Sequence, residues 1–233
     1  MSFPVHPSGS AQEPPLARAG IRLAGFCERW FPDAFVFALG AVAVVFGFGL
    51  ALGEPPARLV REFGDGFWGL VPFTMQMALI IIGGYVVATT PAVYLLIQKV
   101  AGITANPRVA IAWIAFFSMA TSLLSWGFSL IFSGLLVREM SRKIKGMDYR
   151  AAGAAAYLGL GAVWALGFSS SAALMMATKG AIPPKLYEIS GLIPLTQTLI
   201  IWPNFLMIVA LLAVSIVVAY YSAPKPERAK TAE

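Results

Sequence analysis

Two short clusters of small and hydroxylated residues interrupt the hydrophobic segments of this chain. The first comprises Ser125, Trp126, Gly127, Phe128 and Ser129, and the second comprises Gly167, Phe168, Ser169, Ser170 and Ser171. Serine hydroxyls donate and accept hydrogen bonds. A broken helix also exposes N–H groups that attract anions and carbonyl oxygens that can hold Na⁺. Together with the neighbouring aromatic rings, these groups would suit a small carboxylate with an apolar tail.

Other chemistries have little support in the residues. An intramembrane hydrolase needs a base beside its serine, and the predicted membrane spans contain no Asp, Glu, Lys, Arg or His. A proton relay through intramembrane carboxylates is excluded for the same reason. His6 and Cys27 are the only histidine and cysteine, so a His/Cys metal site cannot be built. We therefore expect no enzyme, no metal site and no cofactor apart from a possible coupling ion, Na⁺ or H⁺; a channel is the alternative that such breaks leave open.

The composition is that of an integral membrane protein. Hydrophobic residues make up 58% of the chain and charged residues 12%, whereas soluble domains have about 25% charged residues. The net charge of +6 does not predict a nucleic-acid partner, because the basic residues lie between hydrophobic runs. In that position they orient a protein in the lipid bilayer.

The N-terminal part is predicted to lie outside the membrane core. Residues 1–15 are rich in proline and small polar residues, which predicts a disordered leader. Residues 16–31 have apolar and arginine residues on different helical faces, which favours an amphipathic helix at the cytoplasmic interface over a plain soluble linker. Asp33 can cap the helix that follows. Residues 1–33 thus form a leader with an interfacial helix, and no signal peptide is recognisable.

A single membrane domain is predicted over residues 34–222. Four segments are apolar enough to cross the bilayer: 34–52, 70–89, 151–178 and about 205–222. Residues 57–69 are a connection that carries charges and membrane-edge aromatics, and 92–103 are too short to cross. Residues 223–233 form a charged C-terminal tail. The expected fold class is therefore an all-α integral membrane protein with about four transmembrane helices.

The first cluster lies at the centre of a long apolar stretch, residues 108–140. Its flanks, 109–124 and 130–137, are each short for a span, which needs roughly 20 residues. Exposed backbone at that depth requires protein or a wet cavity around it. The stretch is therefore either a re-entrant helical hairpin or one long tilted helix.

Charge distribution favours the hairpin. With a hairpin, 13 of the 17 Lys and Arg residues lie on the same side of the membrane as the N-terminus and 4 lie on the opposite side. With one long helix that crosses the membrane, 7 lie on the side of the N-terminus and 10 on the opposite side. Basic residues concentrate on the cytoplasmic side. Two short complete crossings would give the same distribution, but the second flank is too short for one. Both termini and the basic loop 138–150 are thus predicted to be cytoplasmic.

The second cluster interrupts the span 151–178. A small-residue break inside a hydrophobic segment is typical of a discontinuous helix, and two such breaks in one chain indicate a substrate site. The alternative is a serine cluster that bonds only to its own helix. The residues therefore predict a secondary transporter of small organic anions.

Short motifs spread over nearly the whole chain resemble the bacterial short-chain fatty acid transporter family, of the acetoacetate and butyrate uptake type. They are Arg29–Asp33, Gly64–Trp68, Met75–Ile80, Trp126–Phe128, Arg138–Glu139, Asp148–Tyr149, Gly167–Ser169 with Ser171, and Gly191–Pro194 followed by Thr198–Leu199. Ser125 and Ser170 depart from the expected Asn and Gly.

The resemblance implies further properties. It implies transport of short-chain carboxylates, such as butyrate or acetoacetate, across the bacterial inner membrane. It also implies one repeat of an inverted-repeat ion-transporter fold, because family members are about twice as long. A second transporter half or a homo-oligomer would then be the partner. A membrane subunit that packs against or regulates a partner without transporting is the alternative.

Overall fold

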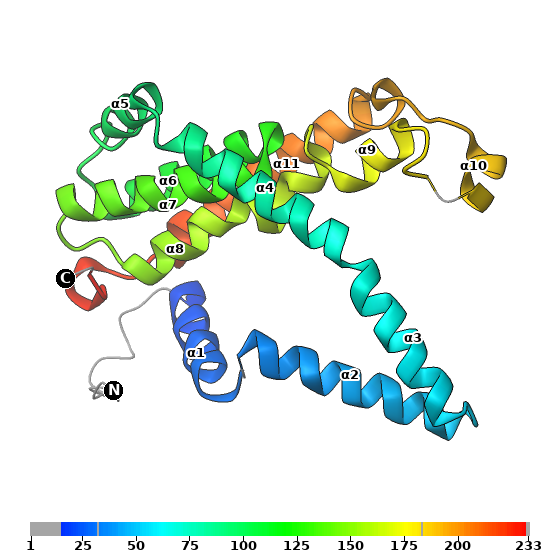
Figure 1. Ribbon diagram of the computed structural model, residues 1–233. Coiled ribbons are helices and arrows are strands. Elements are labelled where there is room, and N and C mark those ends of the chain that lie inside the picture. Colours follow the sequence, from blue (N-terminus) through cyan, green and yellow to red (C-terminus); the bar gives the residue numbers. More distant parts are fainter. Residues whose placement is uncertain (1–14, 32, 183, 232–233) are drawn as a thin grey trace. The chain divides into compact units, whose positions relative to one another are not determined.

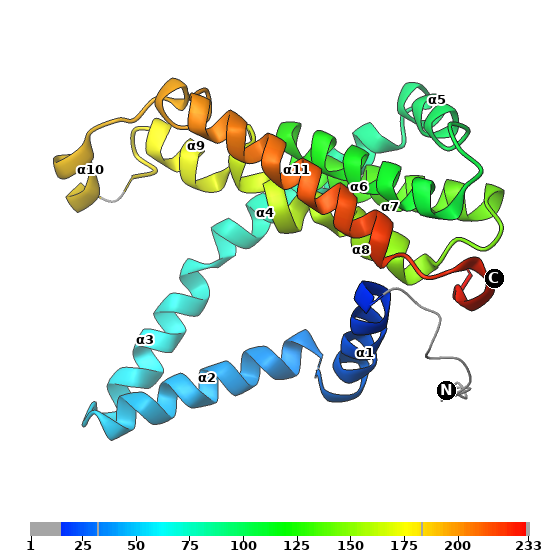
Figure 2. The same ribbon diagram turned by 180° about the vertical axis from the view of Figure 1, so that it is seen from behind.

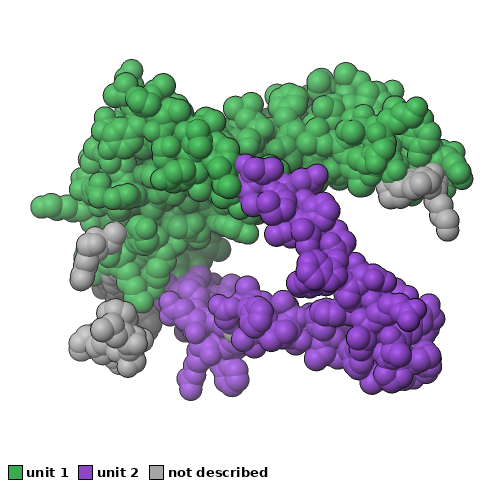
Figure 3. Space-filling model, viewed as in Figure 1, with its two compact units in different colours: residues 1–18, 80–233 green, residues 19–79 purple. Residues whose placement is uncertain are grey.

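The computed structural model describes residues 15–31, 33–182 and 184–231, and these residues form helices and turns without any strand (Figure 1). This confirms the all-α class. The chain divides into two compact units. One comprises residues 19–79, and the other comprises residues 1–18 together with residues 80–233 (Figure 3). The predicted leader 1–15 falls almost wholly outside the described residues, and the two units are described separately below.

Residues 19–79 contain most of α1 (Pro15–Trp30), then α2 (Ala34–Ala51), α3 (Pro56–Gly69) and the first half of α4 (Val71–Ala88). Asp33 caps α2 as predicted, since its carboxylate accepts a hydrogen bond from the N–H of Phe35 at 2.8 Å. The connection expected over 57–69 is instead the helix α3. A proline at its first position and ion pairs from Arg58 to Glu54 and Glu62 favour the helix.

The larger unit is built around α6 (Pro107–Leu124), which contacts α7 (Trp126–Lys143), α8 (Tyr149–Leu158) and α11 (Trp202–Ser222). These helices lie side by side in both views (Figures 1 and 2). The buried core between them is apolar and includes Ile111, Ile114, Phe132 and Leu136. The short α5 (Pro91–Val100) packs on α7 and forms most of the segment 92–103, which was predicted to be too short to cross the membrane.

The first cluster is a break between two helices, as predicted. Ser125 has an extended backbone and ends α6. Its hydroxyl also caps α7, because it accepts a hydrogen bond from the N–H of Phe128 in the first turn of that helix. The second limb is longer than the predicted 130–137, because α7 continues through the basic residues to Lys143. Arg142 and Lys143 lie in the last turn, where positive charge stabilises the negative pole of the helix. Both limbs contain 18 residues, and re-entry of the pair into one leaflet stays a prediction.

The second cluster interrupts a helix, as predicted. After α8 the chain forms a π-helical turn, η1 (Gly159–Val163), and a 3₁₀ turn, η2 (Trp164–Leu166). It then bends over residues 167–170, and α9 (Ser171–Ala177) resumes the helix. The remaining elements are α10 (Pro184–Ser190) and the 3₁₀ turns η3 (Leu195–Gln197) and η4 (Pro226–Arg228). The connection between α9 and η3 thus contains a short helix.

Five helical segments of the described chain are long and apolar enough to cross a membrane: Ala34–Ala51, Pro56–Ala88, Pro107–Leu124, Tyr149–Ala177 and Trp202–Ser222. Four of them overlap the predicted spans, and the fifth is the first limb of the predicted hairpin. The last begins at Trp202 rather than at Phe205, because a proline suits the first turn of a helix. The chain is a multi-pass membrane protein.

Candidate functional site

The two predicted clusters meet in the folded chain, although about 40 residues separate them. The N–H of Trp126, at the start of α7, donates to the Ser169 hydroxyl at 3.0 Å. The N–H of Phe168 donates to the carbonyl of Leu123, in the last turn of α6, at 2.7 Å. These two bonds join the end of the α6–α7 pair to the break that precedes α9.

Glycines allow this close approach. Gly167 is buried, and a Cβ at its position would lie 2.5 Å from the Cα of Leu123. On the other side of the first break, α4 crosses α7 backbone to backbone. A Cβ on Gly84 would lie 2.6 Å from the carbonyl carbon of Gly127, and a Cβ on Gly127 would lie 2.7 Å from the side chain of Ile80. Larger residues at these positions would force the helices apart.

Several serines predicted to contact a ligand already hold the protein together. The hydroxyls of Ser125 and Ser170 cap α7 and α9, by accepting hydrogen bonds from Phe128 and Ala173 respectively. Ser129 is buried and donates to the carbonyl of Ser118 at 2.7 Å, within the core. Ser170 therefore fits the alternative of a serine that bonds to its own helix, and Ser129 has a packing role in the core.

Other predicted residues are more accessible. Phe168 and Ser171 are exposed, while Trp126 and Ser169 are half-buried. Phe128 is half-buried, with its ring centroid 5.5 Å from that of Phe132 in the core. Of the ten residues, six are exposed or half-buried and thus have surface left at the joined breaks: Ser125, Trp126, Phe128, Phe168, Ser169 and Ser171.

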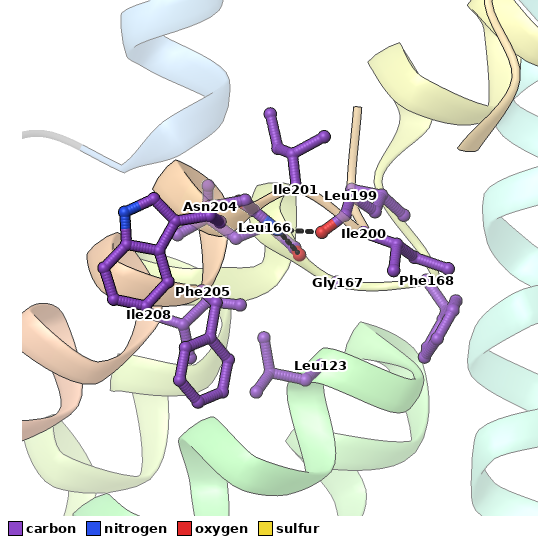
Figure 4. Close-up of a pocket in the computed structure, with 11 residues that line it drawn as sticks. Leu123, Leu166, Gly167, Phe168, Leu199, Ile200, Ile201, Asn204, Phe205 and Ile208 are labelled. Carbon is purple, nitrogen blue, oxygen red and sulfur yellow. Dashed lines mark hydrogen bonds between the residues drawn. The ribbon is translucent and has the colours of Figure 1, made fainter. Parts of the chain in front are cut away.

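A cavity of about 400 Å³ lies beside the second break (Figure 4). Its lining is mostly apolar and comes from α6, η2, the break, the segment that leads into α11 and the first turns of α11. The lining residues are Leu123, Leu166, Gly167, Phe168, Leu199, Ile200, Ile201, Trp202, Asn204, Phe205 and Ile208. Of the predicted site residues, the cavity therefore takes in Gly167 and Phe168 only.

Asn204 also lines the cavity and was not predicted from the sequence. It is 6% exposed, and its amide nitrogen donates to the carbonyls of Leu166 at 3.1 Å and Leu199 at 2.7 Å, as Figure 4 shows. It thereby holds the end of η2 against the segment preceding α11. Its signal in the sequence was a carboxamide within an otherwise apolar run, next to Pro203.

The buried acid of the larger unit lies away from the breaks. Asp148 caps α8, and its carboxylate accepts hydrogen bonds from Arg150 and from the N–H groups of Ala151 and Lys230. Burial raises the pKa of Asp148, but these hydrogen bonds outweigh that effect, so the pKa lies below its ordinary value. The N–H of Tyr149 donates to the carbonyl of Lys230 at 2.8 Å. The predicted charged tail is therefore fastened to this loop.

No group of three or more His, Cys, Asp or Glu residues that could hold a metal occurs in the described part of the chain. The cavity lining contains no ionisable side chain. The arrangement can offer hydroxyls, backbone groups, one carboxamide and apolar surface to a small molecule.

Comparison with known proteins gives a family. The model of the family described as "Short chain fatty acid transporter" matches residues 15–233. A protein of Escherichia coli K12 named "Putative short-chain fatty acid transporter" is 36% identical over 202 residues, which cover 86% of this chain and 45% of that protein. A Haemophilus influenzae protein of the same name is 31% identical over 222 residues, or 93% of this chain and 49% of that protein. The chain spans about half the length of these curated relatives, and no solved structure matches it.

Proposed function

The chain belongs to the short-chain fatty acid transporter family, and we propose that it forms part of a secondary transporter for small monocarboxylates such as butyrate or acetoacetate. The proposal extends from the family to a substrate class and a mechanism. It assigns no catalytic residue and no enzyme activity to the chain.

The observation that carries the proposal is the joining of the two breaks beside an apolar cavity. Residues from α6, α7 and the second break converge there through the hydrogen bonds of Trp126 and Phe168. Broken helices in membrane transporters supply substrate sites from backbone and hydroxyl groups. The cavity volume of about 400 Å³ falls within the usual range of small-molecule pockets, about 300–1,000 Å³.

In this proposal, the two ends of the substrate bind to different parts of the site. The short alkyl chain lies against the apolar lining, which includes Leu123, Phe168 and Phe205. The carboxylate lies at the breaks, where Ser169 and Ser171 provide hydroxyl donors and the positive pole of α7 favours an anion. Ser125, Gly127, Ser129 and Ser170 shape the breaks rather than bind the ligand directly.

The energy for uptake comes from a coupled ion, Na⁺ or H⁺. Carbonyl oxygens freed at a helix break are suitable Na⁺ ligands. A proton, by contrast, would have to travel with the substrate carboxylate, because the described spans carry no ionisable side chain in their breaks. Comparing uptake under a Na⁺ gradient with uptake under a pH gradient distinguishes the two.

We place the chain in the bacterial cytoplasmic membrane with both termini in the cytoplasm. Five basic residues lie between Arg138 and Arg150, in the loop that joins α7 to α8. Such clusters stay on the cytoplasmic side. In this arrangement the α6–α7 pair enters and leaves the membrane on that side.

We further propose that the chain acts with a second transporter half. In transporters built from inverted repeats, the substrate site lies at the repeat interface, so one repeat supplies only part of it. Two copies of this chain inserted in the same orientation cannot form an inverted pair.

The experiment is uptake of labelled butyrate and acetoacetate into proteoliposomes under an imposed Na⁺ or H⁺ gradient. One preparation contains this chain alone, and another contains a complete transporter that includes it. We expect saturable accumulation in the second and none in the first. Accumulation by the chain alone would contradict the need for a second half, and no uptake by either would contradict the transport function and favour a subunit that does not transport.

A further inference from the structure

A buried cluster of serines joins α6 and α7 to the π-helical turn η1. The Ser118 hydroxyl donates to the carbonyl of Ala156 at 2.6 Å and accepts from the N–H of Gly159 at 2.9 Å. The Ser122 hydroxyl donates to the carbonyl of Gly159 at 2.8 Å. Ser118, Ser122 and Ser129 are at most 1% exposed. Three hydrogen bonds from α6 therefore hold the backbone at the start of η1.

These bonds replace the ordinary pairing of an α-helix. The N–H of Gly159, the residue at which α8 passes into the π turn, donates to a side chain on another helix. The carbonyl of Gly159 accepts from the N–H of Trp164, five residues later, which is the π pattern. Ser118 and Ser122 thus bond the backbone at the residue where α8 ends and the π turn begins.

The fit around Gly159 is close enough to fix the turn in position. A Cβ on this glycine would overlap the carbonyl oxygen of Ser118 and would lie 2.7 Å from the Ser129 hydroxyl. The backbone of η1 is therefore in direct contact with both α6 and α7. No other residue type would allow these three segments to meet.

The turn determines where the second break lies. Gly159 is bonded to Ser122, whereas Phe168, nine residues later, is bonded to Leu123, the next residue of α6. A straight α-helix would advance roughly 14 Å over nine residues, at about 1.5 Å each. Both contacts can form only because the chain changes course through η1, η2 and the bend at Gly167.

We propose that Ser118 and Ser122 are positioning residues, which hold the π turn and thereby set the break of residues 167–170 against α7. The inference rests on the proposed function, since that break is the proposed carboxylate site. Return of the turn to α-helical pairing would move every later residue by one position, or about 100° around the helix axis. The hydroxyls and N–H groups of the break would then point away from α7.

The test uses two variants of different severity. Ser118→Ala removes the hydroxyl that bonds both the carbonyl of Ala156 and the N–H of Gly159. Ser122→Ala is milder, because the carbonyl of Gly159 keeps its bond from Trp164. Ser133→Ala is the matched control, since the Ser133 hydroxyl is buried on α7 and has no hydrogen-bond partner among the described residues.

One readout does not depend on transport. In a Cys27→Ser background, Ala173→Cys reports on the break, because Ala173 is 6% exposed and a thiol there reacts only when α9 is displaced. Ala110→Cys, at a site 0% exposed near the start of α6, reports on general unfolding. Losing one buried hydrogen bond shifts the equilibrium between the packed and the displaced position of α9 about 5- to 150-fold. We expect the labelling rate at position 173 to rise about fivefold or more in the 118 and 122 variants, with no matching rise at position 110.

The second readout is uptake by a complete transporter that carries the same variants. We expect KM for a short-chain carboxylate to rise about fivefold or more at similar maximal velocity, and Ser133→Ala to leave it unchanged. An equal rise at positions 173 and 110, or no change at 173 in either variant, would overturn the positioning role. If the unmodified transporter takes up no carboxylate, the proposed function fails, whereas the labelling comparison still decides the positioning role.

Discussion

Asn204 offers a direct measurement of how firmly the second break is held. Asn204→Leu keeps the approximate size of the side chain and removes the amide that bonds Leu166 and Leu199. Neither carbonyl has another hydrogen-bond partner in the described part of the chain. The substitution therefore leaves two polar groups without partners at the edge of the cavity.

The expected loss of stability follows from these two bonds. A buried carbonyl deprived of its partner costs about 1–3 kcal/mol. Both carbonyls belong to residues that line the cavity, so water can reach them and the cost of each lies at the low end. We expect a total loss of about 2–3 kcal/mol. At about 2–4 °C per kcal/mol for a chain of this size, the midpoint of thermal unfolding should fall by about 4–12 °C.

The assay is thermal unfolding of the purified protein in detergent, followed by tryptophan fluorescence. Asn106→Ala is the control, since Asn106 is exposed and only caps α6 through the N–H groups of Arg108 and Val109; its loss should cost about 1 kcal/mol. A midpoint for Asn204→Leu no lower than that of Asn106→Ala would refute the reasoning.

Three further predictions test other contacts. Gly84→Ala should destabilise the protein by about 1–3 kcal/mol, because its new methyl group would meet the backbone of α7, whereas Gly134→Ala, with no atom within 4 Å of its Cβ, should have little effect on the same unfolding midpoint. Because the pKa of Asp148 is lowered in the folded protein, its ionised carboxylate contributes fully to the free energy of unfolding above the ordinary carboxyl pKa of about 3.9, and this contribution is lost as the pH falls through the lower folded value. Hydrogen exchange at the Lys230 amide should therefore accelerate only in that acidic range. In Asp148→Asn it should be faster at all pH values. Lys145→Cys in a Cys27→Ser background should resist an impermeant thiol reagent in intact cells, and ready labelling from outside would contradict the cytoplasmic loop and the hairpin.

The breaks could be predicted from the sequence because they depend on local composition. Small and hydroxylated residues inside apolar runs at 125–129 and 167–171 are visible without any knowledge of packing. The ends of the helices were less predictable. We expected the second limb to end before Arg138, but α7 continues to Lys143, since basic residues stabilise the last turn of a helix.

The partners of the site residues could not be predicted, because they are remote in sequence. Asn204 bonds to a carbonyl 38 residues away, and Asp148 accepts a bond from Lys230, 82 residues away. The π turn also has no local signature, since it depends on serines supplied by α6. Periodicity and composition describe each helix alone, whereas these features depend on how two helices meet.

The hydrogen bonding at the joined breaks has a consequence for affinity. The N–H of Trp126 and the N–H of Phe128 donate to the hydroxyls of Ser169 and Ser125 within the protein. A carboxylate that took either donor would replace one hydrogen bond by another, so the gain per contact would be only the difference between a charged and a neutral acceptor, about 1 kcal/mol. Under the proposed function, a site of this kind would exchange hydrogen-bond partners at little net gain, and it would release its ligand on a timescale that favours rapid turnover over tight retention.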